Sequence, residues 1–191
     1  MREDEPIRLP RALMLVPEGA EEMEVTIVVD VLRRGGVDVV MACLNGGEPV
    51  RCSRGVHISP DTRFVDIEGD FDVVVLPGGA EGVRRLCASA DVGELLRRRE
   101  AKGELVAAIC AAPLALRHHK VFADRTMTCH PSVESRVMEH GRRGEGAVVV
   151  DGNLITSRGP GTTFAFALAI LARLRGEGIA HDVEKPLMLA G

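Results

Sequence analysis

The stretch Leu105-Val106-Ala107-Ala108-Ile109-Cys110-Ala111-Ala112-Pro113 decides the fold class of this chain. Its apolar run is long enough for one strand buried on both faces, and it ends at a cysteine that precedes the helix-competent segment 114–117. At such a turn, unpaired backbone N–H groups and the positive end of a helix dipole favour the thiolate. Cysteine is also a common buried residue, so the stretch alone leaves nucleophile and core packing equally open for Cys110.

The rest of the chain alternates apolar runs with amphipathic segments. The runs predict buried strands, and the amphipathic segments predict helices that cover them. We expect strands at 12–16, 37–43, 71–76, 105–109 and 125–128, and helices at 21–34, 91–102, 132–140 and 162–175. We expect hairpins within 49–59 and between 147–150 and 154–156, across Asp151-Gly152-Asn153. This pattern predicts an α/β, doubly wound, mostly parallel sheet with helices on both faces and small appended hairpins.

The length of 191 residues, with 46% hydrophobic and 27% charged residues, indicates one globular domain. We expect a flexible leader at 1–10, which lacks the apolar core of a secretory signal, and a single domain over 11–191. The formal net charge of −4 and the lack of Trp and Tyr disfavour sequence-specific nucleic-acid binding. No apolar run is long enough to span a membrane. Five scattered cysteines disfavour a disulfide framework and predict a reducing, cytoplasmic location.

Three turns are expected to meet at the carboxyl edge of the predicted sheet, where doubly wound folds bind their ligands. They are 17–20, 77–79 and the turn at Cys110. Gly78 and Gly79 can present backbone N–H groups to an oxyanion there, although glycines also mark ordinary tight turns.

The first predicted helix carries carboxyl groups on its apolar side. At 100° per residue, Glu24 falls among Ile27, Val28 and Val31, and Glu21 lies in the same arc one turn earlier. Burial disfavours the charged form, so we predict a raised pKa and a proton-transfer role for Glu24. For Glu21 we prefer an interaction with the helix dipole. The expected apolar arc comprises Met23, Val25, Ile27, Val28, Val29, Val31 and Leu32, and the polar arc Glu22, Thr26, Asp30, Arg33 and Arg34.

Other residues carry weaker signals. His130 follows a predicted strand and can serve as a base for Cys110, although a lone histidine is more often structural. Arg54 and Arg34 fit either a solvated surface or the border of an anionic site. The segment Arg158-Gly159-Pro160-Gly161-Thr162 precedes a helix and can bind an anion, but it lacks the Walker pattern. The sequence shows no metal-ligand cluster, and no G-x-G-x-x-G pattern opens a helix.

Four motifs occur in one order: Glu18-Gly19-Ala20-Glu21-Glu22-Met23-Glu24, Val74-Val75-Leu76-Pro77-Gly78-Gly79, Ala107-Ala108-Ile109-Cys110-Ala111-Ala112-Pro113 and Thr156-Ser157-Arg158-Gly159-Pro160-Gly161-Thr162. Together they closely resemble the ThiJ/PfpI superfamily, in the branch of the parkinsonism-associated protein deglycase, over about 11–189. The resemblance implies a flavodoxin-like homodimer without metal or organic cofactor.

The resemblance also implies roles for individual residues. Cys110 is the implied nucleophile, and Glu24 is the protonated partner of its thiolate. Gly79 and Ala111 supply oxyanion N–H groups, and His130 matches a nearby histidine whose catalytic part is less certain in this branch. Arginines near the site and the dimer interface correspond to Arg54 and Arg34. The predicted substrate-binding set is completed by Gly78, Glu21 and Pro160.

The implied activity is that of a glutathione-independent glyoxalase and deglycase. Its substrates are small α-oxoaldehydes such as methylglyoxal and glyoxal, and their early adducts with protein side chains or nucleotides. Two alternatives stay open. One is a redox-sensing chaperone in which Cys110 oxidises to a sulfinate. The other, ranked last, is a cysteine peptidase or amidohydrolase, which requires an acid that orients His130.

Overall fold

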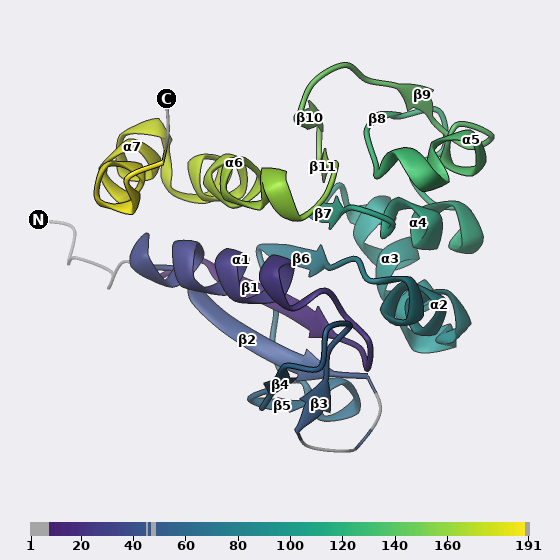
Figure 1. The fold of residues 1–191 in the computed structure, drawn as a ribbon, viewed down its shortest axis with the longest axis horizontal. Coiled ribbons are helices and arrows are strands. Elements are labelled where there is room, and N and C mark those ends of the chain that lie inside the picture. The colour runs from purple at the N-terminus through teal and green to yellow at the C-terminus, as the bar shows by residue number, and fades with distance from the viewer. Residues whose placement is uncertain (1–7, 45, 47–48, 190–191) are drawn as a thin grey trace, which may run out of the picture.

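The computed structural model describes residues 8–44, 46 and 49–189. A seven-stranded sheet in the order β10-β11-β7-β6-β1-β2-β5 forms its centre (Figure 1). Neighbouring strands are parallel except for the β10–β11 hairpin. The strands are β1 (Arg11–Val16), β2 (Asp38–Cys43), β5 (Thr62–Arg63), β6 (Val73–Leu76), β7 (Leu105–Ile109), β10 (Val148–Asp151) and β11 (Leu154–Ser157). The predicted doubly wound α/β sheet is therefore confirmed.

Helices cover both faces of the sheet. One face carries α1 (Glu22–Arg34), α6 (Thr163–Arg175) and α7 (Glu177–Glu184). The other carries α2 (Ala80–Ala88), α3 (Ala90–Lys102), α4 (Pro113–His119) and the single turn α5 (Glu134–Val137).

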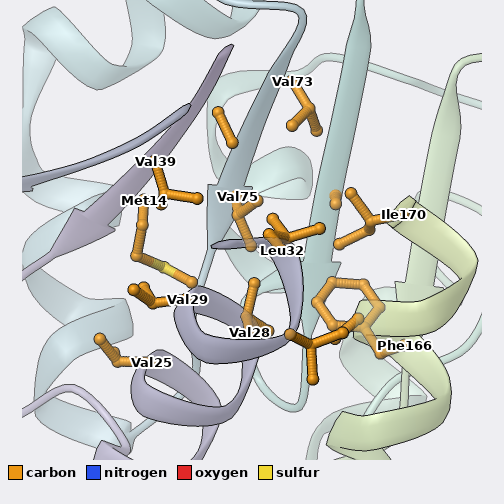
Figure 2. Packing of buried hydrophobic residues seen from close by; sticks show 14 of the residues in the cluster. Met14, Val25, Val28, Val29, Leu32, Val39, Val73, Val75, Phe166 and Ile170 are labelled. Carbon is orange, nitrogen blue, oxygen red and sulfur yellow. The ribbon is translucent and has the colours of Figure 1, made fainter. Parts of the chain in front are cut away.

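The apolar strands explain this layering, because successive side chains of a strand point to opposite faces. In β1, Met14 packs in the core under α1 and α6, whereas Leu13 and Leu15 pack in the core under α2 to α4. Figure 2 shows the first core, in which Leu32 of α1 and Phe166 of α6 gather over the sheet. Burial on both sides accounts for strands that read as continuous apolar runs.

Several elements differ from expectation. The helix predicted at 132–140 is present only in part: a 3₁₀ turn (Pro131–Val133) leads into the single turn α5. The chain then turns so that β8 (Thr126–Met127) pairs with β9 (Arg142–Arg143). The sequence pattern did not predict α2, α7, β5 or β9. The hairpin within 49–59 is confirmed as β3 (Val50–Arg51) and β4 (His57–Ile58). Further 3₁₀ turns lie at Phe64–Asp66, Pro160–Thr162 and Lys185–Leu187.

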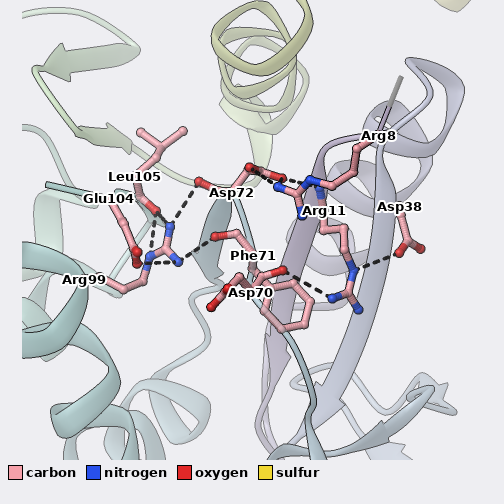
Figure 3. A network of polar contacts seen from close by, with 9 residues as sticks. All are labelled: Arg8, Arg11, Asp38, Asp70, Phe71, Asp72, Arg99, Glu104 and Leu105. Carbon is pink, nitrogen blue, oxygen red and sulfur yellow. Dashed lines mark hydrogen bonds and ion pairs between the residues drawn. The ribbon is translucent and has the colours of Figure 1, made fainter. Parts of the chain in front are cut away.

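A polar network ties together the amino-terminal edge of the sheet (Figure 3). Arg99 of α3, only 3% exposed, donates to the carbonyl oxygens of Phe71, Asp72 and Leu105 at 2.9–3.1 Å. Its guanidinium also lies 3.2 Å from the Glu104 carboxylate. The predicted leader mostly falls at 1–7, outside the described residues, but Arg8 pairs with the Asp72 carboxylate at 2.8 Å. No helix in the described ranges is long and apolar enough to cross a membrane.

Candidate active site

The site lies at the opposite, carboxyl edge of the sheet, where β6 and β7 end side by side. Cys110 directly follows β7 and has a φ of 63°, a left-handed conformation that non-glycine residues rarely adopt. Two backbone hydrogen bonds fix it: its N–H donates to Ser157 O at 2.9 Å, and its carbonyl oxygen accepts from His130 N–H at 2.8 Å. Strained backbone of this kind is held in place by its surroundings and is common at functional sites.

Glu24, in the first turn of α1, is fully buried. Its Oε2 accepts a hydrogen bond of 2.6 Å from Gly78 N–H. Its Oε1 is buried and has no hydrogen-bond partner among the described residues. Burial raises the pKa of Glu24 to about 7, against the opposing effect of the Gly78 hydrogen bond. The raised pKa predicted from the helical pattern is confirmed.

Gly78 keeps the carboxyl group and the thiol together. A Cβ atom at this position would lie 2.6 Å from Cys110 Cβ, 3.0 Å from Cys110 Sγ and 2.7 Å from Glu24 Oε2. These separations are shorter than van der Waals contacts, so any side chain at this position would push Glu24 and Cys110 away. The glycine therefore has a steric role in addition to its N–H group.

The Cys110 thiol differs from expectation. Burial, together with the charge of Glu24, raises its pKa to about 12, although the backbone N–H groups of Ala111 and Gly79 lower it. The expectation that the turn alone favours the thiolate is therefore wrong, because the loss of solvent and a neighbouring carboxylate outweigh two N–H groups. A protonated Glu24 removes the repulsion. The thiolate of Cys110 is therefore easier to form when Glu24 is protonated.

His130 lies close to the thiol but is not oriented by an acid. A Cβ on Gly159 would lie 3.4 Å from His130 Cδ2 and 3.9 Å from Cys110 Sγ, which places both side chains beside the same glycine. The ring nitrogen Nδ1 accepts from Ser132 N–H at 3.2 Å and lies 2.7 Å from Ser132 Oγ. In the part of the chain that the structure describes, no carboxylate hydrogen-bonds to this ring. The arrangement lacks the third member that a cysteine peptidase requires.

Residues 10–173 match the model of the DJ-1/PfpI family. The chain belongs to this family. Within it, the chain falls in the DJ-1 (Parkinson disease protein 7) branch. It is 49% identical to the Drosophila melanogaster protein dj-1beta, covering 94% of this chain and 97% of that protein. It is 48% identical to the Danio rerio Parkinson disease protein 7 homolog, with the same coverage.

Two further similarities bear on activity and fold. The chain is 41% identical to the Caenorhabditis elegans protein named glutathione-independent glyoxalase DJR-1.2, covering 93% of this chain and 95% of that protein. The crystal structure of Drosophila melanogaster DJ-1beta superposes with a TM-score of 0.93 at 47% identity, covering 96% of this chain and all of that one. The DJ-1 fold predicted for this chain is therefore established.

Of the remaining predicted residues of this DJ-1 family chain, Glu21 and Pro160 lie near the thiol and Glu24, whereas the side chains of Arg54 and Arg34 do not contribute to the site. Glu21 is 9% exposed and accepts a hydrogen bond of 2.8 Å from Ser53 Oγ, and Pro160 adjoins Gly159 beside the thiol. The backbone N–H of Arg54 donates to the carboxylate of Glu22 at the start of α1, but the Arg54 side chain is exposed. Arg34 is not at the site of this chain: it lies ten residues, or about 15 Å, beyond Glu24 along α1 and pairs with Asp30 at 2.6 Å.

The start of α1 also corrects the helical arcs. Glu22, assigned to the polar arc, is buried, whereas Met23, assigned to the apolar arc, is 50% exposed. The segment that follows β3 packs on the helix here, and Glu22 accepts hydrogen bonds from Ser53 Oγ at 2.9 Å and Arg54 N–H at 2.9 Å. Burial alone would raise the pKa of Glu22, but hydrogen bonds from its own backbone N–H, from Ser53 Oγ and from the backbone of Arg54 and Val56 together outweigh burial and lower the pKa. Periodicity could not reveal a contact that a distant segment provides.

Among the described residues, no group of three or more His, Cys, Asp or Glu side chains could hold a metal ion. The polar groups beside Cys110 are a carboxyl group, an imidazole and backbone N–H groups. This set is suited to moving protons and to binding an oxyanion.

Proposed function

We propose that this protein is a glutathione-independent glyoxalase that acts on small α-oxoaldehydes such as methylglyoxal and glyoxal. The observation that carries the proposal is the fully buried Glu24 beside the half-buried Cys110, with the carboxyl pKa raised to about 7 and Oε2 accepting a hydrogen bond of 2.6 Å from Gly78 N–H. Such a carboxyl group both gives and takes a proton near neutral pH. The name of the Caenorhabditis elegans relative supports the same activity.

In the proposed mechanism, the Cys110 sulfur adds to the aldehyde carbon and forms a hemithioacetal. The N–H groups of Gly79 and Ala111 stabilise the developing oxyanion. Glu24 removes the proton from the former aldehyde carbon, giving an enediol, and returns it to the neighbouring carbon. The product is a thioester of Cys110, which water hydrolyses to release lactate or glycolate and the free thiol. Each step balances without a cofactor.

The same nucleophile supports a deglycase activity on early adducts of these aldehydes with protein side chains or nucleotides. An adduct with an amine or thiol is a hemiaminal or hemithioacetal that is in equilibrium with the free aldehyde. Direct attack and consumption of the released aldehyde therefore give the same products. An assay in which free aldehyde is continuously trapped separates them, because only direct attack continues under these conditions.

The decisive test measures lactate formation from methylglyoxal, without glutathione, in the wild type, Cys110→Ser and Glu24→Gln. We expect the serine variant to be inactive and the glutamine variant to lose at least 10²-fold, since proton transfer typically contributes about 10²–10⁴-fold. Cys87→Ser is the matched control for loss of a thiol and keeps wild-type turnover. Equal rates in all four proteins would overturn the assignment.

A second candidate function is redox sensing, and it is favoured by Glu24 Oε1, which is buried and has no hydrogen-bond partner in the described part of the chain. Two equivalents of peroxide would each transfer one oxygen to the Cys110 sulfur and leave as water, giving a sulfinate. A protonated Glu24 beside it would donate a hydrogen bond to the new oxygen. Intact-mass measurement after mild peroxide should show two added oxygens that map to Cys110. First oxidation at another cysteine would contradict this role, including its chaperone form.

We further propose that the protein is a cytoplasmic homodimer. None of the five cysteines, all of which lie in the described ranges, forms a disulfide, as fits a reducing compartment. Met23 of α1 and Val56 of the adjoining hairpin are each 50% exposed, and the Glu22–Arg54 contact joins their two segments. An apolar surface of this kind suits a second copy. Met23→Glu should shift the sedimentation coefficient to that of a monomer, whereas an unchanged coefficient would argue for another interface.

A further inference from the structure

A second thiol lies in a separate, positively charged cavity. The cavity has a volume of about 350 Å³ and is lined by residues of α2, α4 and α5, and α4 packs against both of the other helices (Figure 1). Its wall includes Cys87 and the side chains of Arg84, Arg117, His118 and Arg136. No Asp or Glu lines it in the part of the chain that the structure describes.

The helical register brings these groups together. Arg84 and Cys87 lie three residues apart on α2, and Arg117 and His118 are on the facing side of α4. The spacing of three residues puts Arg84 and Cys87 on one face of α2. Both Arg117 and His118 of α4 line the same cavity. Arg136 contributes from α5. Three guanidinium groups from three elements thus surround one cavity.

The ion pairs that the cavity arginines already form do not prevent these arginines from binding an added carboxylate. Arg84 pairs with Glu81 at 2.6 Å and Arg117 pairs with Glu139, and all four side chains are at least one-third exposed. Exposed pairs of this kind contribute little, so an incoming carboxylate can replace them. Within the described ranges, Arg136 has no ion-pair partner.

Cys87 is reachable but not strongly activated. It is half-buried, in contrast to the fully enclosed Cys43, and it lines the cavity directly. Burial raises the pKa of its thiol, while the charge of Arg136 lowers it. Only a small fraction of thiolate forms near neutral pH. Selective reaction at Cys87 therefore requires that the cavity concentrate the reagent.

We propose that this cavity is a modification site in which a small disulfide with several carboxylates, of the glutathione disulfide class, docks on the arginines and exchanges with Cys87. In the exchange, the Cys87 thiol loses its proton to solvent and its sulfur attacks one sulfur of the disulfide. A new S–S bond forms, the old one breaks, and the released thiolate takes up a proton. The disulfide is the oxidant. The site is independent of the Glu24–Cys110 pair and of the proposed glyoxalase activity.

The test compares two disulfides and measures the modification rate of Cys87 by peptide mass spectrometry. Glutathione disulfide carries the carboxylates, and 2-hydroxyethyl disulfide is uncharged. We expect Arg136→Ala to slow the reaction with glutathione disulfide about fivefold, as is reasonable for the loss of one charge-assisted contact, with a much smaller effect on the neutral disulfide. Arg142→Ala, which removes an exposed charge on β9 outside the cavity, is the matched control and should change neither rate.

Three results would overturn the proposal. One is that Cys87 reacts with glutathione disulfide no faster than the buried Cys43. Another is that Arg136→Ala slows both disulfides equally, which would mean that Arg136 acts only on the thiol pKa. The third is an equal effect of Arg136→Ala and Arg142→Ala, which would mean that only net charge matters. Cys87→Ser should remove the mapped adduct and leave lactate formation at the wild-type rate, so failure here does not bear on the Cys110 chemistry.

Discussion

Each of the two edges of the central sheet buries one ionisable side chain, and the two side chains differ in whether their polar atoms have hydrogen-bond partners. At the amino-terminal edge, Arg99 is 3% exposed and donates to three backbone carbonyl oxygens beside the Glu104 carboxylate. At the carboxyl edge, Glu24 is fully buried and its Oε1 lacks a hydrogen-bond partner in the described residues. A satisfied charge stabilises the fold, whereas an unsatisfied carboxyl group holds a proton that it can release.

The largest expected effect tests the amino-terminal edge. Arg99→Ala leaves the carbonyl oxygens of Phe71 and Leu105 without their donor and should lower the free energy of unfolding by about 3–5 kcal/mol. Urea denaturation measures this change. Arg98→Ala, at the exposed neighbouring position, is the control and should stay within about 0.5 kcal/mol. Activity per folded molecule should not change, and a selective loss of activity would remove the distinction between the two edges.

The second prediction concerns the carboxyl edge and the pH dependence of the free energy of unfolding. The folded state raises the pKa of Glu24 from 4.5 to about 7, so it binds more protons than the unfolded state between these values. Wild-type stability should therefore fall as the pH rises through this window. Glu24→Gln should not show this fall and should be more stable at pH 8 by up to about 3 kcal/mol.

Urea denaturation at a series of pH values measures the difference, and Glu94→Gln, at an exposed position on α3, serves as the control. Parallel pH profiles for wild type and Glu24→Gln would show that Glu24 is already satisfied in the folded protein. The contrast with Arg99 would then be wrong.

A third change tests how tightly the carboxyl edge is built. In Gly78→Ala, the new Cβ would lie 2.6 Å from Cys110 Cβ and 2.7 Å from Glu24 Oε2, so the two reacting groups must separate. A displacement of about 1 Å costs catalysis on the order of 10²-fold. Lactate formation without glutathione gives the measurement. In Gly178→Ala the added methyl group meets no atom within 4 Å, and this variant should keep wild-type turnover.

The smallest expected effect concerns Arg34, which belongs to neither of the two buried sites. Arg34 forms an exposed i,i+4 pair with Asp30 at the far end of α1. Arg34→Ala should change the free energy of unfolding by only about 0.3–0.5 kcal/mol and leave turnover unchanged. Urea denaturation and the lactate assay check both values. A large loss of activity would show that Arg34 reaches a site through a second copy of the chain.

The pattern of apolar residues was sufficient to predict the sheet, because burial on both faces removes polar residues from parallel strands. The same logic identified Glu24 as a buried carboxyl group, since a helix position is fixed by its own neighbours. It failed for Glu22, which is hydrogen-bonded by the segment after β3, about 30 residues away, and for Met23, which is 50% exposed. It also missed α2, in which Gly82 and two arginines obscure the apolar face.

The sequence by itself determined the doubly wound fold, the cysteine at the end of the buried strand β7 and an acid on the apolar side of the first helix. Only the tertiary structure decided that Gly78, because it has no side chain, lets Glu24 and Cys110 lie close together, and that Arg34 lies far from them. It also showed that burial and Glu24 raise the pKa of Cys110 rather than leave a ready thiolate. The reason is physical: periodicity records which side of an element faces the core, but a pKa depends on all charges and dipoles within a few ångströms, whichever segments supply them.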